Sequence, residues 1–392
     1  MKTLALSVLI ALLAGAASAP GSPVEHGGDW PSSTPEEQGM DGRVIEALSR
    51  EFADGRHGYV DGMLVVRHGH VVFEASYRHD YAKLFEGKGP GGMYNYYDPD
   101  WHPYYRGSDL HTLQSVSKSV TSALVGIAIA RGELPGVDAK VSRYFEGFRV
   151  GEDPRRARTT LRDLLTMTSG IEWDEETVSY TDPRNSCAAM EASADWVQYV
   201  LDRPMAREPG EVFVYNSGVT VLLAQVLRSA TGMQADDYAA LHLLRPLGIE
   251  RFYWKRTPTR VPDTEGGLYL APRDLAKIGA LYLNDGVWNG RRLLPEGWAR
   301  ESTAPRVETE PDAPRPVKYG YQWWALPDPK AASDPAFAAW GYGGQFLIVV
   351  PDEDVVAVFT GWNIYDKPSL SPLFALDRVL AAVRPPAAPR AE

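Results

Sequence analysis

Ser115 and Lys118 are the residues of this chain whose types and spacing best fit a chemical role. They lie in QSVSKSVTSALVGIAIARG, residues 114–132, where a polar beginning leads into an apolar run. Side chains three residues apart share one face of a helix, so a helix that begins here would place a hydroxyl beside an amine. A neighbouring base that takes its proton activates a serine hydroxyl. The pair therefore predicts nucleophilic chemistry, with Ser115 as the nucleophile and Lys118 as its base.

The predicted helix start adds a second catalytic element. A residue at this position has an unpaired backbone N–H, and the positive end of the helix dipole favours an oxyanion there. Lys118 must be neutral to accept a proton, so its pKa of about 10.4 has to fall by about 3, which costs roughly 4 kcal/mol. Residues 123–130 are apolar on every face of the helix, which is typical of a buried helix. We expect burial to lower the pKa of Lys118.

Other reactive patterns carry less weight. The sequence has no Gly-x-Ser-x-Gly and no His-Glu-x-x-His motif, and its eight histidines show no triad spacing. GKGPGG at 87–92 matches a dinucleotide-binding pattern but follows no clear strand and opens no helix. The histidines in 67–70 fit a solvated turn better than a metal site. Cys187 is the only cysteine, which excludes an intramolecular disulfide, and we interpret it as structural.

Composition limits the class of partner. The chain has 392 residues and a net charge of -11, which argues against nucleic acid, because phosphate binding needs a basic face. Near the N-terminus, a lysine, an apolar run from Leu4 to Leu13 and the small residues Ala17-Ser18-Ala19 predict a signal peptide over 1–19 and a periplasmic or secreted protein. The apolar run is shorter than the about 20 residues of a membrane span. Residues 385–392 resemble a disordered tail.

The elements around the Ser-Lys pair follow from periodicity. Residues 62–77 alternate on both sides of a Gly-containing turn and predict a hairpin. Apolar spacing predicts one helix within residues 215–232, ending at Gly232, and another over 272–283. Thr160 and Asp163 form a capping box. Segments 319–326, 343–351 and 354–362 read as strands, and a helix over 369–383 follows. Strands at both chain ends predict a single α/β (α+β) domain over 20–384, with one sheet and an inserted helical region at about 133–260.

An aromatic, turn-rich segment covers residues 81–110. Its rings either line a cleft or pack against one another in a folded loop. The residues concerned are Tyr94, Tyr96, Tyr97, Trp101, Tyr104 and Tyr105.

Several ordered motifs resemble those of one hydrolase superfamily. The segments are MLVVRHGHVVFE, LQSVSKSVTSALVGIAIARGEL, LLTMTSGI, EPGEVFVYNSG, GGLYLAPRDLAKIGALYLNDG, YGYQWW and GYGGQFLIVVPDEDVVAVFTGW. They are similar to the serine β-lactamase and penicillin-binding protein superfamily, in its class C branch with family VIII esterases and aminohexanoate-dimer hydrolases. The resemblance covers about residues 60–385. It implies a β-lactamase/transpeptidase-like fold, an antiparallel sheet from both chain ends flanked by helices.

The resemblance also implies roles for individual residues. Ser115 would be the nucleophile, Lys118 its base, and Tyr215, the first residue of a Tyr-x-Asn motif, a proton relay to the leaving group. The N–H groups of Ser115 and Tyr342 would form the oxyanion hole. Substrate-binding positions would be Ser217, Gly343 and Trp173, although core packing is an equal alternative for Trp173.

This sequence departs from the family pattern at two positions. Ser217 stands where the motif has Asn, and a hydroxyl has a shorter reach and fewer donors than an amide. The third motif, 339–345, carries no cation where the family has a lysine or histidine, which removes a charge-assisted contact to a substrate carboxylate. Both departures argue away from β-lactams and peptidoglycan stems and favour esters or linear amides.

The resulting hypothesis is a serine hydrolase that forms an acyl-enzyme with a small carboxylic ester or linear amide and needs no metal or cofactor. One alternative is a β-lactamase or D-alanyl-D-alanine carboxypeptidase. Another is a binding module that kept the fold and lost catalysis. The sequence leaves the natural substrate and the oligomeric state open.

Overall fold

A computed structural model describes residues 30–84, 86, 102–310, 313–327, 335–364 and 370–384. The predicted signal peptide and C-terminal tail lie outside these ranges. So do four of the six aromatic residues singled out in the turn-rich segment, Tyr94, Tyr96, Tyr97 and Trp101. Within the described part of the chain, no helix has the length and apolar character needed to cross a bilayer.

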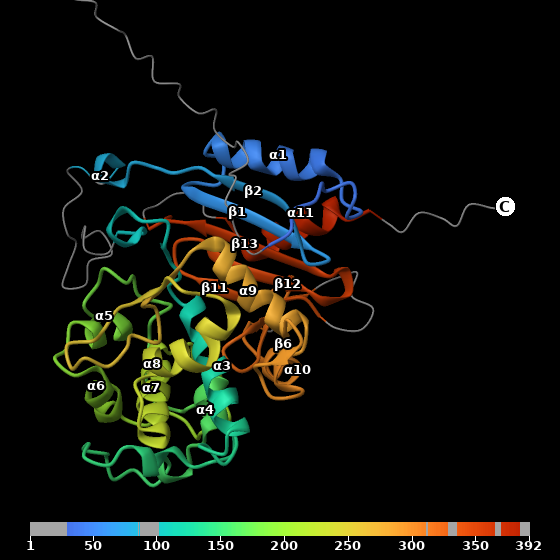
Figure 1. The fold of residues 1–392 in the computed structure, drawn as a ribbon. Helices are drawn as coiled ribbons and strands as arrows, with labels where there is room; N and C mark the ends of the chain where they lie inside the picture. Colours follow the sequence, from blue (N-terminus) through green and yellow to red (C-terminus); the bar gives the residue numbers. More distant parts are fainter. Residues whose placement is uncertain are drawn as a thin grey trace, which may run out of the picture.

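An antiparallel eight-stranded sheet joins the two ends of the chain (Figure 1). The N-terminal strand β1 pairs with the C-terminal strand β13, with Leu64 opposite Val358. This arrangement confirms the prediction of a sheet assembled from both ends. In sheet order the strands are β2 (His70–Ser76), β1 (Val60–Arg67), β13 (Val355–Gly361), β12 (Gln345–Val350), β11 (Phe337–Gly341), β10 (Trp324–Ala325), β9 (Lys318–Tyr319) and β8 (Val307–Glu308).

The predicted strand over 319–326 is wrong in detail. The structure has two short strands there, β9 and β10, paired antiparallel with Trp324 opposite Tyr319. A turn separates them, and Gln322 within it has a φ of 62°, a left-handed conformation that breaks an extended strand. The hairpin predicted over 62–77 is confirmed as β1 and β2, with Gly69 in the turn at a φ of 72°.

Side-chain alternation along the strands divides the core between two faces of the sheet. Phe346 and Ile348 of β12 face one hydrophobic cluster, whereas Leu347 and Val349 face the other, as expected for the two-residue period of a strand. Helices α1 (Gly42–Ala53) and α11 (Pro372–Ala382) cover the first face. Helices α3 (Val116–Ala130) and α9 (Pro272–Leu283) cover the second. The sequence predicted α9 with these bounds.

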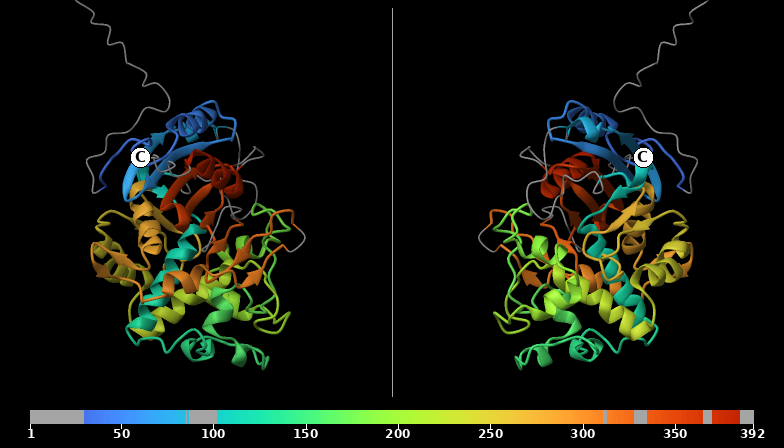
Figure 2. Two further views of the ribbon diagram at one scale, coloured as in Figure 1. Left: turned by 90° about the vertical axis from the view of Figure 1, so that its right-hand side faces the viewer. Right: turned by 90° about the vertical axis from the view of Figure 1, so that its left-hand side faces the viewer.

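Helix α3 lies between the sheet and a helical region (Figure 1). That region contains α4 (Leu161–Leu165), α5 (Ser186–Glu191), α6 (Trp196–Asp202), α7 (Ser217–Thr231) and α8 (Ala235–Ala239). Figure 2 shows it at the opposite end of the molecule from α1 and α11. The predicted capping box is present at α4, and Gly232 ends α7 at a φ of 72°. Between the sheet and this region, α3 is buried from Val116 to Ala128.

Shorter elements complete the frame around α3. A three-stranded sheet of β3 (His111–Thr112), β5 (Leu268–Leu270) and β4 (Tyr253–Trp254) places the chain that enters α3 beside the loop between β4 and β5. The remaining elements are α2 (Tyr81–Leu84), β6 (Val287–Trp288), β7 (Arg291–Arg292) and α10 (Trp298–Thr303).

Candidate active site

The start of α3 brings Ser115 and Lys118 together. Ser115 is the N-cap of α3 and follows Gln114, whose φ of 47° turns the chain sharply from β3 into the helix. The Lys118 Nζ donates to the Ser115 Oγ at 2.8 Å. Ser115 is half-buried, and Lys118 is 1% exposed. The hydroxyl therefore reaches solvent while its amine partner is enclosed.

Ser115 opens onto a cleft of about 870 Å³. Its described lining residues include six aromatic side chains, Tyr180, Phe213, Tyr215, Trp324, Trp340 and Tyr342. The wall combines residues from the helical region with residues from the sheet, so the cleft lies where the two parts of the fold meet. Tyr180 and Phe213 were not predicted to line a cleft. Tyr180 lies outside the family-like motifs, and Phe213 lies in EPGEVFVYNSG, where only Tyr215 and Ser217 were given roles.

Tyr215 lies beside the Ser-Lys pair, immediately before the N-cap of α7. The Lys118 Nζ is 5.3 Å from the centroid of its ring, and the ring stacks on Trp324 at 5.8 Å. Burial raises the pKa of Tyr215 to about 12; Lys118 opposes this increase and Glu175 adds to it. The phenol is therefore protonated at neutral pH and has a proton to donate.

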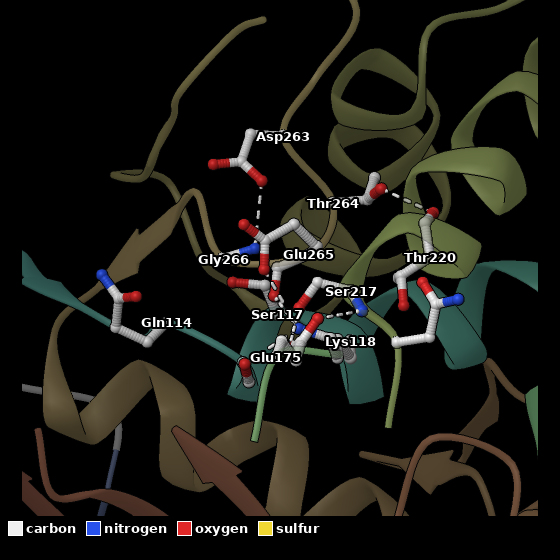
Figure 3. Close-up of polar contacts among 12 residues, drawn as sticks. Gln114, Ser117, Lys118, Glu175, Ser217, Thr220, Asp263, Thr264, Glu265 and Gly266 are labelled. Carbon is white, nitrogen blue, oxygen red and sulfur yellow. Dashed lines mark hydrogen bonds and ion pairs between the residues drawn. The ribbon is translucent and has the colours of Figure 1, made fainter. Parts of the chain in front are cut away.

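Lys118 donates three hydrogen bonds, which matches the number of N–H groups of an ammonium. Besides Ser115, it donates to the Glu265 carbonyl oxygen at 2.8 Å and to Glu265 Oε2 at 3.1 Å (Figure 3). Burial acts against the charge, but Tyr215, Glu265 and Glu175 outweigh it, and the pKa of Lys118 is raised. Burial lowers this pKa as expected, but the predicted net decrease is wrong, because the sequence did not reveal the surrounding acids.

Glu175 is a buried carboxylate at the edge of the cleft. It accepts from the Ser217 backbone N–H and from the Ser217 hydroxyl, both at 2.8 Å, and from Tyr180 Oη at 3.0 Å. The indole N–H of Trp173 is a fourth donor. Burial raises the pKa of Glu175 and outweighs Lys118, the Ser217 N–H and the Trp173 indole, which lower it. WDEE at 173–176 gives no signal that separates this glutamate from the next one.

The contacts of Glu175 explain where two predicted substrate-binding residues lie. Ser217 is 1% exposed and donates its hydroxyl to Glu175 (Figure 3). Trp173 packs edge-on against Tyr199 in the core, so its alternative interpretation as core packing fits. Neither residue is among the described residues that line the cleft.

The third motif lies at the end of β11. A Cβ on Gly341 would come within 2.4 Å of the Leu113 carbonyl oxygen, so this strand end packs tightly against the chain that enters α3. Tyr342 follows, is 37% exposed and lines the cleft with Ser115. Gly343 lies in the turn between β11 and β12 at a φ of 85°, and its carbonyl accepts from the Asn363 N–H at 2.9 Å. The oxyanion-hole role of the Tyr342 N–H stays a prediction.

Cys187 and Glu191 of α5 lie next to Glu265. The thiol and the two carboxylates lie within 4.8 Å of one another, the one such group found in the described part of the chain. Lys118 already supplies a cation to Glu265, and we assign no metal here. Burial and the acids Glu191, Glu265 and Glu175 raise the pKa of Cys187, which fits a structural thiol better than a nucleophilic thiolate.

Comparison with known proteins gives this geometry a context. Residues 44–361 match the family described as Beta-lactamase. The chain is 26% identical over 283 residues to 6-aminohexanoate-dimer hydrolase of Paenarthrobacter ureafaciens, covering 65% of this chain and 68% of that protein. It is 29% identical over 283 residues to penicillin-binding protein 4 of Amycolatopsis lactamdurans, covering 62% and 69%. A family VIII carboxylesterase structure superposes with a TM-score of 0.63 at 16% identity, covering 90% and 98%; at that identity the likeness shows the fold alone.

Proposed function

The chain belongs to the Beta-lactamase family, and on that basis we propose that it is a serine hydrolase that forms an acyl-enzyme at Ser115. The contact that carries the proposal is the 2.8 Å hydrogen bond between the Lys118 Nζ and the Ser115 Oγ at the wall of the cleft. Tyr215 lines the same cleft. A nucleophile, an amine and a phenol that meet at one accessible point are the groups that acyl transfer requires.

In the first half-reaction, Ser115 Oγ attacks the substrate carbonyl carbon. The Oγ–C bond forms as the hydroxyl proton passes to the neutral form of Lys118, and the carbonyl π electrons move onto oxygen. The N–H groups of Ser115 and Tyr342 stabilise that oxyanion. Tyr215 then donates its proton to the leaving oxygen or nitrogen as the bond to carbon breaks, and Lys118 returns a proton to the phenol.

The second half-reaction regenerates the serine. Water adds to the acyl carbon while Lys118 takes one of its protons. The carbon–Oγ bond then breaks, Oγ recovers the proton from Lys118, and a carboxylic acid leaves. No step requires a metal or an organic cofactor.

Small esters and linear amides are the substrate class that the cleft supports best. Among its described lining residues, Arg315 is the only lysine or arginine, and it forms an ion pair with Asp377 at 2.7 Å. Partial burial and the neighbouring Glu175 and Glu310 raise the pKa of Glu176, which also lines the cleft. An acidic, aromatic cleft disfavours the carboxylate that penicillins and peptidoglycan stems carry.

A β-lactamase or D-alanyl-D-alanine carboxypeptidase is the second candidate. The similarity to a penicillin-binding protein favours it. Nitrocefin turnover or a stable adduct with a fluorescent penicillin, faster than any ester reaction, would place this candidate first.

We also propose that the protein is exported, because residues 1–19 have the composition of a signal peptide. Intact-mass analysis of protein from the periplasm or medium of an expressing bacterium tests this. A mature chain that lacks about 19 residues supports export, and a full-length cytosolic chain contradicts it.

Labelling by a fluorophosphonate probe, with peptide mapping by mass spectrometry, tests the central proposal. We expect label on Ser115, and we expect Ser115→Ala to abolish both label and nitrophenyl-ester turnover. Ser179→Ala is the matched control, since Ser179 also lines the cleft but bonds to Thr181. If Ser115 stays unlabelled in folded protein and Ser115→Ala keeps full turnover, the chain is not a Ser115 hydrolase. Ligand binding without any acyl-enzyme would favour the binding-module alternative.

A further inference from the structure

Glu265 makes two of the three hydrogen bonds of Lys118, although no motif of the sequence pointed to it. Its carbonyl oxygen and its carboxylate both accept from Nζ, at 2.8 and 3.1 Å. Lys118 is 1% exposed and Glu265 is 5% exposed. A carboxylate this close to a buried amine stabilises the ammonium strongly, because little water is present to screen the pair.

The loop that carries Glu265 is fixed to the helices around the site. Thr264 Oγ1 donates to the Thr220 carbonyl of α7 at 2.8 Å, and Gly266 N–H donates to Asp263 Oδ1 at 3.0 Å (Figure 3). The Leu268 N–H donates to Ser117 Oγ of α3 at 3.1 Å. The position of the carboxylate relative to Lys118 is therefore set by the fold and not by a mobile side chain alone.

We infer that Glu265 is a positioning residue for the proposed reaction: its carboxylate holds Lys118 as an ammonium directed at Ser115 and thereby makes acylation increase with pH. The inference rests on the proposed function. Lys118 can accept the serine proton only after it has lost one of its own, and the carboxylate opposes that loss. The lowered pKa of Glu265, in which Lys118 and Glu191 outweigh the effect of burial, agrees with a carboxylate that remains charged.

Several other ionisable groups face the pair, and the test has to separate them from Glu265. They are Glu175 from the loop after α4, Cys187 and Glu191 from α5, Tyr215 before α7, and Asp263 and Lys255 from the β4–β5 loop. Among the contacts described here, the Glu265 side chain is the carboxylate in direct contact with Nζ. Removing its charge should therefore affect Lys118 more than a change at the others.

The rate of Ser115 labelling by a fluorophosphonate at pH 7 and pH 9 measures the effect. The neutral fraction of an amine rises about tenfold per pH unit below its pKa, so the wild-type rate should increase by about 100-fold. Glu265→Gln keeps the shape but not the charge, and its increase should fall below about 10-fold. Glu265→Asp retains a carboxylate and should behave like the wild type. An equal pH ratio in wild type and Glu265→Gln overturns the inference.

A second measurement avoids the risk that Glu265→Gln fails to fold. In wild-type protein with ¹⁵N-labelled lysine, the Lys118 amine resonance should remain that of an ammonium at pH 10, and Lys118→Met assigns it by its disappearance. Titration clearly below the ordinary lysine pKa of about 10.4 overturns the inference. The two proposals fail differently: without label on Ser115 at any pH the proposed function fails, whereas label with an unchanged pH ratio removes only the role of Glu265.

Discussion

Asp61 and Glu265 are both buried carboxylates, but their partners differ. Asp61, on β1, accepts from Tyr81 Oη at 2.6 Å and contacts His111 Nε2 at 3.0 Å and His79 Nδ1 at 3.1 Å. None of these four side chains is among the described residues that line the cleft. Glu265 instead bonds to Lys118, which bonds in turn to the half-buried Ser115.

The difference in partners suggests different roles: the charge of Asp61 stabilises the fold, whereas the charge of Glu265 acts on the proposed reaction. Burial acts against the charge of Asp61, yet His111, His79 and Tyr81 outweigh it and lower its pKa. These partners connect β1 to the chain before α3, so the charge of Asp61 stabilises the packing of these two segments. The charge of Glu265 instead pairs with the Lys118 ammonium, which donates to the half-buried Ser115 hydroxyl. Mutations around Glu265 and Lys118 should therefore affect activity, and mutations around Asp61 should affect stability.

The largest effect should come from Lys118→Met, which removes the amine that lies between Glu265 and Ser115. Loss of the base should reduce the ester turnover rate by about 10³-fold, within the usual range for general bases. Lys277→Met is a matched control, because Lys277 is a buried lysine paired with Asp274 on α9. The control should lose stability and keep its turnover per folded molecule. Stopped-flow kinetics measures the turnover of both variants, and thermal melts measure their stability. Equal losses of turnover in Lys118→Met and Lys277→Met would contradict a special role of Lys118.

Tyr215→Phe should have the next largest effect, and its size should depend on the leaving group. An alkyl alcohol needs a proton to leave, so turnover of an ethyl ester should fall by about 10²-fold. A nitrophenolate leaves without help, so the nitrophenyl ester should lose much less. Tyr319→Phe controls for the packing of a neighbouring buried phenol. Equal losses on both esters would exclude Tyr215 as the proton donor.

The sequence predicted Ser115, Lys118 and Tyr215 because each of them belongs to a recognisable local pattern. Ser115 and Lys118 share a helix turn, and Tyr215 stands directly before a helix whose cap and apolar spacing are recognisable. Glu265 is 147 positions from Lys118, and Glu175 is 42 positions from Ser217. Contacts over such separations depend on how loops pack, and neighbouring acidic residues look identical in one sequence.

The wrong prediction of a lowered pKa for Lys118 has the same origin. Burial of the helix was predictable from its apolar run, but the pKa depends on burial and on charges from other elements together. Strands at both chain ends likewise predicted the sheet, whereas the turn at Gln322 that splits β9 from β10 left no mark in the strand pattern.

Asp61→Asn tests whether the buried carboxylate on β1 contributes to stability alone. The variant weakens three hydrogen bonds to a buried charge, so the free energy of unfolding should decrease by about 2 kcal/mol, measured in urea at pH 7. Because folding lowers the pKa of Asp61, its stabilisation is present above the unfolded pKa of about 3.9 and is lost as the pH falls below it. The difference between wild type and variant should shrink toward pH 3. Turnover per folded molecule should stay within twofold, and a loss above tenfold would contradict a purely structural Asp61.

Arg315→Met should have the smallest effect, because the Arg315–Asp377 pair is a charged pair of a third kind. Its side chains are 36% and 49% exposed, and exposed ion pairs contribute at most about 1 kcal/mol to stability. Arg315 lines the cleft, yet Asp377 already accepts from two of its nitrogens, at 2.7 and 3.0 Å. The KM of a neutral ester and that of an ester with a free carboxylate should therefore each change less than about threefold. A tenfold increase for the carboxylate substrate alone would show that Arg315 binds anionic substrates, and the cleft would then have the cation that its third motif lacks.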